Sequence, residues 1–194
     1  MINYDFKDKN VIVTGASMGL GYAIALEFVK AKANVIIADI NIDEALKAKE
    51  KLESYGTKVE AYKIDVSKYD EFVDLTNYVV NKFGSIDILV NNAGIFIAEM
   101  FNDMETSKMD KLISVNLNGT VYGCRAVLPI MKQKHYGKVV NISSIAAKLG
   151  GAGAAIYSAT KAGVLELTAC LAREYAKDNI NINCVLPGII RTPL

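Results

Sequence analysis

The 194-residue sequence has no tryptophan, one histidine, three cysteines and three prolines. The cysteines, Cys124, Cys170 and Cys184, lie far apart and show neither the CxxC spacing nor the Cys/His pairing of a metal site. We therefore predict no metal ion and three buried, reduced thiols, which are typical of a cytoplasmic protein. His135, the single histidine, lies in the polar stretch KQKHYGK and is expected to be a solvent-exposed helix-end residue. Catalysis by histidine is therefore not expected.

Long hydrophobic runs and excess charge are also missing. Charged residues interrupt every apolar run before it reaches the roughly 18 residues of a membrane span. Residues 1–10, MINYDFKDKN, lack the apolar core of a secretory signal. The net charge is only +1, which gives no electrostatic reason to expect nucleic acid or an anionic membrane as a partner. We expect a cytoplasmic protein without either partner.

Strand-like and helix-like segments alternate along a chain that is 52% hydrophobic. Short apolar runs predict buried strands at 10–14, 34–38, 58–64, 86–90, 138–142 and 180–186. Longer amphipathic segments predict helices at about 19–32, 42–55, 68–83, 107–133 and 155–177. This alternation predicts an α/β fold with a doubly wound parallel sheet in strand order 3-2-1-4-5-6. Residues 1–194 are expected to form a single domain.

A glycine-rich turn joins the first predicted strand to the first predicted helix. The glycines let the backbone approach a pyrophosphate, and the helix N-terminus adds N–H groups and a partial positive charge. The spacing is GxxxGxG. We predict dinucleotide contacts from Gly15, Ser17, Met18, Gly19, Leu20 and Gly21.

An acidic residue, Asp39, ends the second predicted strand, 18 residues after Gly21. This distance is close to that expected of a carboxylate that binds the ribose hydroxyls of adenosine. Such a carboxylate would repel a 2′-phosphate, and the glycine turn carries Met18 where a basic residue would be needed. NAD is therefore favoured over NADP, with Ile40 as a neighbouring contact.

Three residues near the end of the chain form a candidate acid–base group. Tyr157 and Lys161 are four residues apart and share one face of a helix. A lysine ammonium beside a phenol favours the phenolate, so the phenol can exchange a proton with a substrate oxygen. Ser144, thirteen residues before Tyr157, can donate a hydrogen bond to the same oxygen. Its neighbour Ser143 is expected to be structural.

Taken together, these residues resemble the short-chain dehydrogenase/reductase family over essentially the whole chain. TGASMGLG (14–21) is similar to the family's cofactor loop, and NNAG (91–94) is similar to its central-strand motif. The resemblance implies a catalytic tetrad of Asn116, Ser144, Tyr157 and Lys161. It implies further cofactor contacts from Asp65, Val66, Asn92, Ala93, Gly94, Tyr157, Lys161, Pro187, Gly188, Ile190 and Thr192.

The function implied by the resemblance is hydride transfer between NAD(H) and a secondary alcohol or ketone of the acetoin/diacetyl, sugar/polyol or hydroxysteroid type. Tyr157 would handle the proton, Ser144 would bind the oxygen, Lys161 would bind the nicotinamide ribose, and Asn116 would hold a relay water. One alternative is a 3-oxoacyl thioester reductase, which usually goes with NADP and a basic residue at Met18. The other is a catalytically silent dinucleotide-binding regulatory protein.

The resemblance also implies features beyond the catalytic group. Family members have a substrate lid and a last strand after the position of Leu194. We therefore expect either a truncated chain or a longer one whose lid is not ordered, and we favour the second. The helices at 107–133 and 155–177 imply a homodimer or homotetramer. The segment 150–155, GGAGAA, is expected to line the substrate pocket with small side chains.

Overall fold

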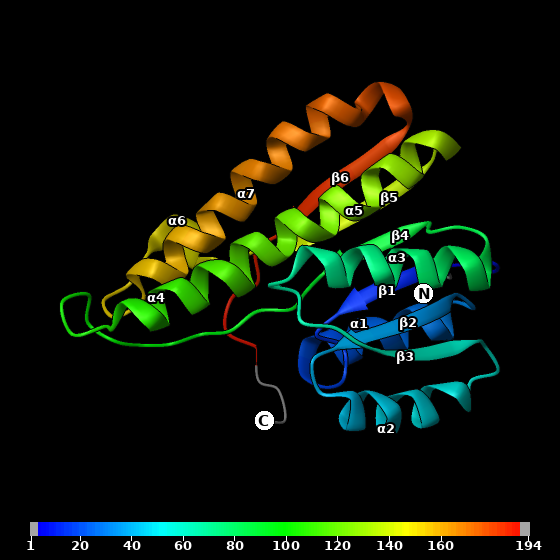
Figure 1. The fold of residues 1–194 in the computed structure, drawn as a ribbon, viewed down its shortest axis with the longest axis horizontal. Coiled ribbons are helices and arrows are strands. Elements are labelled where there is room, and N and C mark those ends of the chain that lie inside the picture. The colour runs from blue at the N-terminus through cyan, green and yellow to red at the C-terminus, as the bar shows by residue number, and fades with distance from the viewer. Residues whose placement is uncertain (1–3, 191–194) are drawn as a thin grey trace.

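The structure is a computed structural model and describes residues 4–190. Its centre is one six-stranded parallel sheet in the order β3-β2-β1-β4-β5-β6, which confirms the predicted order (Figure 1). The strands are β1 (Asn10–Thr14), β2 (Asn34–Asp39), β3 (Val59–Lys63), β4 (Ile88–Asn91), β5 (Gly137–Ile142) and β6 (Ile180–Val185).

Helices cover both faces of this sheet and form two separate apolar clusters. One cluster packs α1 and α2 on one face, and the other packs α3, α5 and α7 on the opposite face. The helices are α1 (Gly19–Lys30), α2 (Ile42–Glu53), α3 (Tyr69–Phe83), α4 (Thr106–Leu112), α5 (Gly119–Lys134), α6 (Ala146–Leu149) and α7 (Ala155–Tyr175).

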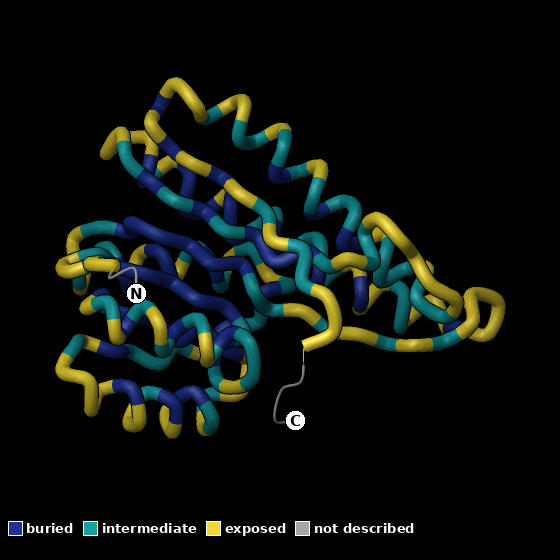
Figure 2. Tube along the Cα trace, turned by 180° about the vertical axis from the view of Figure 1, so that it is seen from behind, coloured by how far each residue is buried: buried dark blue, intermediate teal, exposed yellow. Residues whose placement is uncertain are grey.

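The middle strands read as continuous apolar runs because both of their faces are buried. Val11 and Val13 of β1 point into the α1–α2 cluster, whereas Ile12 points into the opposite one. Figure 2 shows these strands as the most continuously buried part of the chain. Polar residues begin where the strands end, so the chemistry of the molecule collects at the carboxyl edge of the sheet.

The predicted helix at 107–133 is not a single α-helix. A π-helical turn over Ile113–Asn118 separates α4 from α5. The turn contains Asn116, which is fully buried, and the hydroxyl of Thr120 donates to the Asn116 carbonyl at 3.2 Å. A π turn adds one residue to the helical repeat, which redirects a side chain without breaking the helix. The apolar periodicity that predicted the helix does not reveal this extra residue.

The prediction that all three cysteines are buried was wrong for two of them. Cys124 is buried in the core, and burial raises the pKa of its thiol to about 12. Cys170 is exposed on α7, and Cys184 is half-buried on β6, because β6 lies at the edge of the sheet. His135 ends α5 in an exposed, left-handed conformation, as predicted.

A chain of buried polar side chains fixes α7 to the sheet. The Asn91 amide on β4 donates to the Asn141 oxygen on β5 at 2.9 Å. The Asn141 amide donates in turn to the Thr168 hydroxyl on α7 at 2.9 Å. Buried hydrogen bonds of this kind specify a unique packing arrangement. The helix that carries Tyr157 and Lys161 is thereby held in register with the central strands.

Candidate active site

The turn between β1 and α1 needs glycine at two positions for lack of space. Gly15 has a φ of +62°, and a Cβ there would lie 2.8 Å from the Cα of Ala93. A Cβ on Gly21 would lie 2.2 Å from the carbonyl oxygen of Gly15. Because neither neighbour is a flexible side-chain end, any other residue would force the backbone to move.

Hydrogen bonds lock the same turn to the end of β4. The Thr14 hydroxyl oxygen accepts the N–H groups of Asn92 at 3.0 Å and Ala93 at 3.1 Å. The Asn92 amide donates to the carbonyls of Thr14 and Gly15, each at 2.9 Å. The side chain of Asn92, a predicted cofactor contact, is therefore used within the protein to hold the glycine turn.

The N-terminus of α1 opens at this turn. Met18, its N-cap, is extended and provides no side-chain hydrogen bond to the first turn of the helix. The first N–H groups of an uncapped helix carry partial positive charge and favour an anionic group. Together with the glycine positions, which leave no room for a Cβ, this fits the pyrophosphate of a dinucleotide.

Asp39 lies at the end of β2, beside the glycine turn. One of its carboxylate oxygens accepts the N–H of Ser17 at 3.0 Å, and the other accepts the N–H of Asn41 at 3.0 Å. Met18 and Ile40 flank it and are exposed. The carboxylate thus ties the glycine turn to the following strand and lies where the ribose prediction requires an acid.

Asp65 and Val66 follow β3. The N–H and hydroxyl of Ser67 donate to the Asp65 carboxylate at 3.0 and 2.6 Å, and these bonds hold its pKa below the ordinary value. Val66 is buried and packs against Gly119 at the start of α5. The pair shares the carboxyl edge of the sheet with Asp39.

The carboxyl ends of β4, β5 and β6 surround a cavity of about 410 Å³. The structure brings Ser144, Tyr157 and Lys161 together in its lining, as the sequence predicts. Among residues 4–190, the lining consists of Leu20, Asn92, Gly94, Ile95, Phe96, Ile142, Ser143, Ser144, Tyr157, Lys161, Pro187, Gly188 and Ile190.

Lys161 is only 4% exposed and has no carboxylate partner among the ion pairs of the described residues. Its ammonium donates to the Ile142 carbonyl at 2.9 Å and lies 5.9 Å from the centre of the Tyr157 ring. Burial without a countercharge lowers its pKa from 10.5 to about 8. Lys161 can therefore gain and lose a proton near neutral pH.

The two adjacent serines differ in their surroundings. Ser143 is buried, and its hydroxyl donates to the Lys161 carbonyl at 2.7 Å, so it joins β5 to α7. The Ser144 hydroxyl accepts the N–H of Ala146 at 3.2 Å and is half-buried. This arrangement fits the expectation that Ser143 is structural and leaves Ser144 for a substrate oxygen.

Asn116 lies beneath the cavity and does not line it. Its side-chain oxygen accepts the Ile95 N–H at 2.8 Å, and its amide donates to the Ile95 carbonyl at 2.9 Å. The same amide lies 3.4 Å from the Thr160 hydroxyl, which donates to the Tyr157 carbonyl at 2.7 Å. Asn116 thus connects the segment after β4 to the helix that carries Tyr157.

Part of the cavity wall was not predicted, namely Ile95, Phe96 and Ile142. The segment 150–155 was predicted to line the substrate pocket but is not among the described residues that line this cavity. It follows the short helix α6, and the Gly153 carbonyl accepts the Glu99 N–H at 2.9 Å. Thr192, a predicted cofactor contact, lies outside the described residues.

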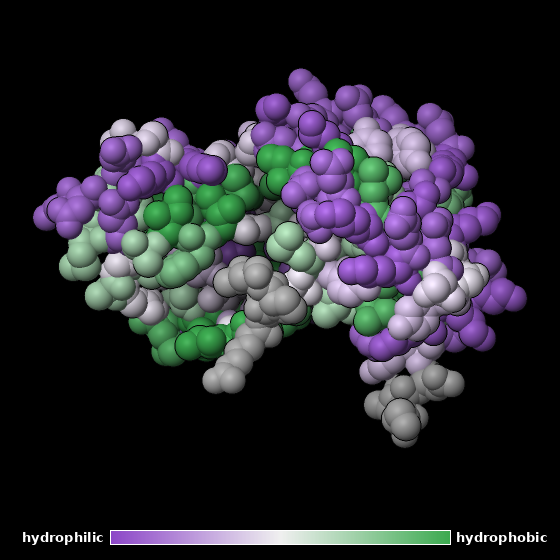
Figure 3. Space-filling view, turned by 90° about the horizontal axis from the view of Figure 1, so that it is seen from below, coloured by the Kyte–Doolittle hydropathy of each residue, from purple (hydrophilic) through white to green (hydrophobic). Residues whose placement is uncertain are grey.

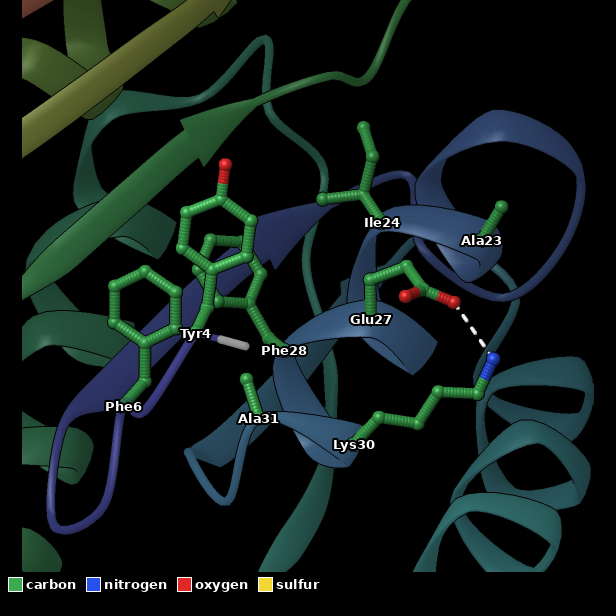
Figure 4. Close-up of a pocket in the computed structure, with 8 residues that line it drawn as sticks. All are labelled: Tyr4, Phe6, Ala23, Ile24, Glu27, Phe28, Lys30 and Ala31. Carbon is green, nitrogen blue, oxygen red and sulfur yellow. Dashed lines mark hydrogen bonds and ion pairs between the residues drawn. The ribbon is translucent and has the colours of Figure 1, made fainter. Parts of the chain in front are cut away.

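A larger cavity of about 620 Å³ lies against the outer side of α1 (Figure 4). Aromatic side chains dominate it, those of Tyr4, Phe6 and Phe28. Its charged residues, Glu27 and Lys30, form an exposed ion pair at 2.7 Å. This cavity has no buried titratable group and is not a candidate for acid–base catalysis.

Known proteins resemble this chain over most of its length. Residues 9–194 match the model of the short chain dehydrogenase family. The chain is 39% identical over 189 residues to the 3-oxoacyl-[acyl-carrier-protein] reductase FabG of Thermotoga maritima, covering 96% of this chain and 76% of that protein. It is 37% identical over 183 residues to the uncharacterized oxidoreductase YxjF of Bacillus subtilis, covering 94% and 71%. A solved structure of NAD⁺-bound xylitol dehydrogenase matches with a TM-score of 0.92 and 29% identity, covering 94% of this chain and 71% of that chain.

The chain therefore belongs to the short-chain dehydrogenase/reductase family. It is an oxidoreductase that acts on a CH–OH group and uses a nicotinamide dinucleotide. Within residues 4–190, no cluster of histidine, cysteine and acidic side chains is suited to hold a metal ion. None of the helices described is both long enough and apolar enough to cross a membrane.

Proposed function

We propose that this protein transfers a hydride between NAD(H) and a small secondary alcohol or ketone. The observation that carries the proposal is the cavity of about 410 Å³, in which Ser144, Tyr157 and Lys161 face the residues next to the glycine turn. An uncapped helix N-terminus, a candidate acid and a buried lysine share one edge of the sheet. Such a convergence of perturbed and polar groups in a cleft is typical of an active site.

The protein's part in the reaction is to place and protonate the substrate oxygen. The nicotinamide, when bound, supplies or accepts the hydride. In the direction of reduction, Ser144 donates a hydrogen bond to the carbonyl oxygen, and the Tyr157 phenol transfers its proton to that oxygen as the alcohol forms. Lys161 then returns a proton to Tyr157, which its pKa of about 8 permits near neutral pH. The hydride and one proton together convert the carbonyl to the alcohol.

Asn116 acts in this scheme by positioning. Two hydrogen bonds to Ile95 hold the segment after β4, and a contact with Thr160 holds the helix that carries Tyr157. We also propose the role that the resemblance implies, in which Asn116 holds a relay water for Lys161.

The preference for NAD rests on Asp39. Its carboxylate lies next to the glycine turn, where it would attract ribose hydroxyls and repel a 2′-phosphate. Within the glycine turn, residues 15–21, there is no basic side chain that could offset the repulsion.

A second candidate is the reduction of a 3-oxoacyl thioester. It is favoured by one observation, the 39% identity to a protein named 3-oxoacyl-[acyl-carrier-protein] reductase. Reduction of such a thioester usually goes with NADP, whereas Asp39 favours NAD. The two candidates are therefore separated by substrate and by cofactor in the same assay.

The test is to follow oxidation of NADH and of NADPH by the purified protein with 2,3-butanedione, a ketose, a 3-ketosteroid and an acetoacetyl thioester. Turnover of a ketone with NADH supports the proposal. Turnover of the thioester alone favours the second candidate. Tight binding of NADH without turnover of any compound contradicts both and supports a regulatory protein.

We further propose that the protein works in the cytoplasm as a homodimer that pairs residues 107–133 and 155–177. Val121, Leu165 and Leu167 lie on these helices and are only half-buried, which supports an apolar contact there. Light scattering coupled to size-exclusion chromatography measures the mass directly, and a mass of 21.1 kDa at all concentrations contradicts the proposal.

A further inference from the structure

Phe96 combines high exposure with a fixed position. Its side chain is 60% exposed, although a phenylalanine in a soluble protein normally buries most of its surface. The preceding residue, Ile95, is held through both its N–H and its carbonyl by the buried Asn116. Because the backbone before it is fixed at two points, Phe96 is held at the cavity although its own ring is open to solvent.

The ring of Phe96 contacts the proposed proton donor. It meets the Tyr157 ring at 4.9 Å between centroids and 83° between planes, which is an edge-to-face arrangement. Aromatic pairs of this geometry attract each other through their quadrupoles. Phe96 thus supports one side of the Tyr157 ring and presents its remaining surface to the cavity that it lines.

The cavity wall around Phe96 is mixed, with apolar side chains beside the polar ones of Asn92, Ser144 and Tyr157. Leu20, Ile95, Ile142 and Ile190 share the cavity wall with it. Lys161 is the one charged side chain among the described lining residues, and its ammonium already donates to a backbone carbonyl. Figure 3 shows hydrophobic side chains both in the left half of its view, below a hydrophilic group, and at its upper centre.

The acidic side chain that follows Phe96 in the sequence, Glu99, is part of an ion pair. Glu99 is paired with Lys108 at 2.9 Å, so neither charge is free for a ligand. A carboxylate packed against the Phe96 ring would lose hydration on that side and gain no hydrogen bond from the ring, which is unfavourable.

From these contacts we propose that Phe96 determines substrate specificity and that the substrate carries a flat apolar group next to its carbonyl. The group packs against the exposed surface of Phe96 while the carbonyl oxygen reaches Ser144 and Tyr157. Substrates with a carboxylate in that place are excluded. The inference rests on the proposed function and adds the class of substrate to it.

The experiment uses three compounds that share one CH3–CO unit and differ in the group attached to it. This group is acetyl in 2,3-butanedione (the methyl compound), benzoyl in 1-phenyl-1,2-propanedione (the phenyl compound) and carboxylate in pyruvate. We expect kcat/KM with NADH to be about tenfold higher for the phenyl compound than for the methyl compound, and lower for pyruvate than for either. Phe96→Ala should reduce the phenyl-to-methyl ratio to about one, and Phe96→Leu should restore part of it.

Phe101→Ala is the matched control. Phe101 is 56% exposed, nearly as much as Phe96, but it is not among the residues described as lining the cavity. Its replacement should leave the phenyl-to-methyl ratio as in the wild type. An unchanged ratio in Phe96→Ala, or an equal loss in Phe101→Ala, overturns the inference.

A binding measurement keeps this test separate from the test of the proposed function. Calorimetry without any cofactor measures the affinity of the protein for 1-phenyl-1,2-propanedione directly. We expect Phe96→Ala to weaken this binding about tenfold and Phe101→Ala to leave it unchanged. If the wild type turns over no ketone, the proposed function fails. The calorimetric comparison then still decides the role of Phe96, and equal affinity in wild type and Phe96→Ala rejects it.

Discussion

The cavity beside α1 and the candidate active site contain the same types of residue but differ in what those residues can do. Each has a tyrosine, a phenylalanine and a lysine in its lining. Lys30, beside α1, is exposed and hydrogen-bonded to Glu27, which raises its pKa above the ordinary value. Lys161 is buried without a carboxylate, which lowers its pKa to about 8.

The larger cavity is therefore the less reactive one. A lysine paired with a carboxylate stays protonated at every physiological pH and cannot act as an acid or a base. A lysine that burial deprives of hydration changes its protonation state within the working range of an enzyme. Burial of charge distinguishes the candidate active site from an apolar depression in the surface better than volume does.

The largest expected effect comes from removing one hydroxyl group from each cavity. Tyr157→Phe removes the proposed proton donor and should lower kcat by about 10³-fold, within the range expected for loss of a general acid. Tyr4→Phe makes the same chemical change beside α1 and should leave kcat unchanged. Steady-state oxidation of NADH with 2,3-butanedione measures both variants.

The affinity for NADH, measured by calorimetry, controls this comparison. Tyr157→Phe retains the ring that Phe96 contacts, so its fold and its binding of NADH should be close to those of the wild type. A Tyr157→Phe variant that keeps most of its activity would show that the proton comes from another group. Loss of activity in Tyr4→Phe would show that the two cavities are coupled.

A smaller effect is expected in the pH dependence of stability. The pKa of Lys161 falls from 10.5 to about 8 on folding, so between these pH values the unfolded chain holds more protons than the folded one. The free energy of unfolding should therefore rise with pH in this interval, by about 3 kcal/mol in total. Urea unfolding across this range, with Lys161→Met as the reference, measures the rise as a difference between the two proteins.

Lys30→Met provides the contrast. The pKa of Lys30 is raised, so its contribution to stability is present below pH 10.5 and is lost only above it. The difference between wild type and Lys30→Met should be flat between pH 8 and 10.5. If the difference in unfolding free energy between wild type and Lys161→Met is also independent of pH in this range, Lys161 is better hydrated than its burial implies.

The sequence predicted the fold well because the sheet is buried on both faces. Strands such as β1 and β2 are then continuous apolar runs, and the helices between them are amphipathic, so both periodicities are visible. The order 3-2-1-4-5-6 is the default for a doubly wound sheet with right-handed connections. The π turn around Asn116 escaped prediction because it changes one hydrogen-bond register without changing the composition.

The candidate site was predictable where short spacing determines geometry and not where distant segments meet. Tyr157 and Lys161 share a helix face, so their spacing alone places them together. Phe96 and Tyr157 are far apart in the sequence, and Asn116, 21 residues after Ile95, holds the backbone beside Phe96. Cys184 was wrongly predicted to be buried because an apolar run does not show whether its strand lies at the edge of the sheet.

The smallest predicted effect is a change of cofactor preference. It compares Asp39, beside the glycine turn, with Glu27, on the outer side of α1. Asp39→Asn removes the charge that should repel a 2′-phosphate, so the ratio of kcat/KM for NADPH to that for NADH should rise about tenfold, since like charges in contact cost several kcal/mol. Glu27→Gln makes the same change in the cavity beside α1 and should leave this ratio unchanged. Because the Ser17 and Asn41 N–H groups both donate to the Asp39 carboxylate, the variant should also lose about 1 kcal/mol of stability. If the cofactor ratio is unchanged in a folded Asp39→Asn protein, the carboxylate does not select the cofactor. Its role is then only to hold the glycine turn through its hydrogen bonds.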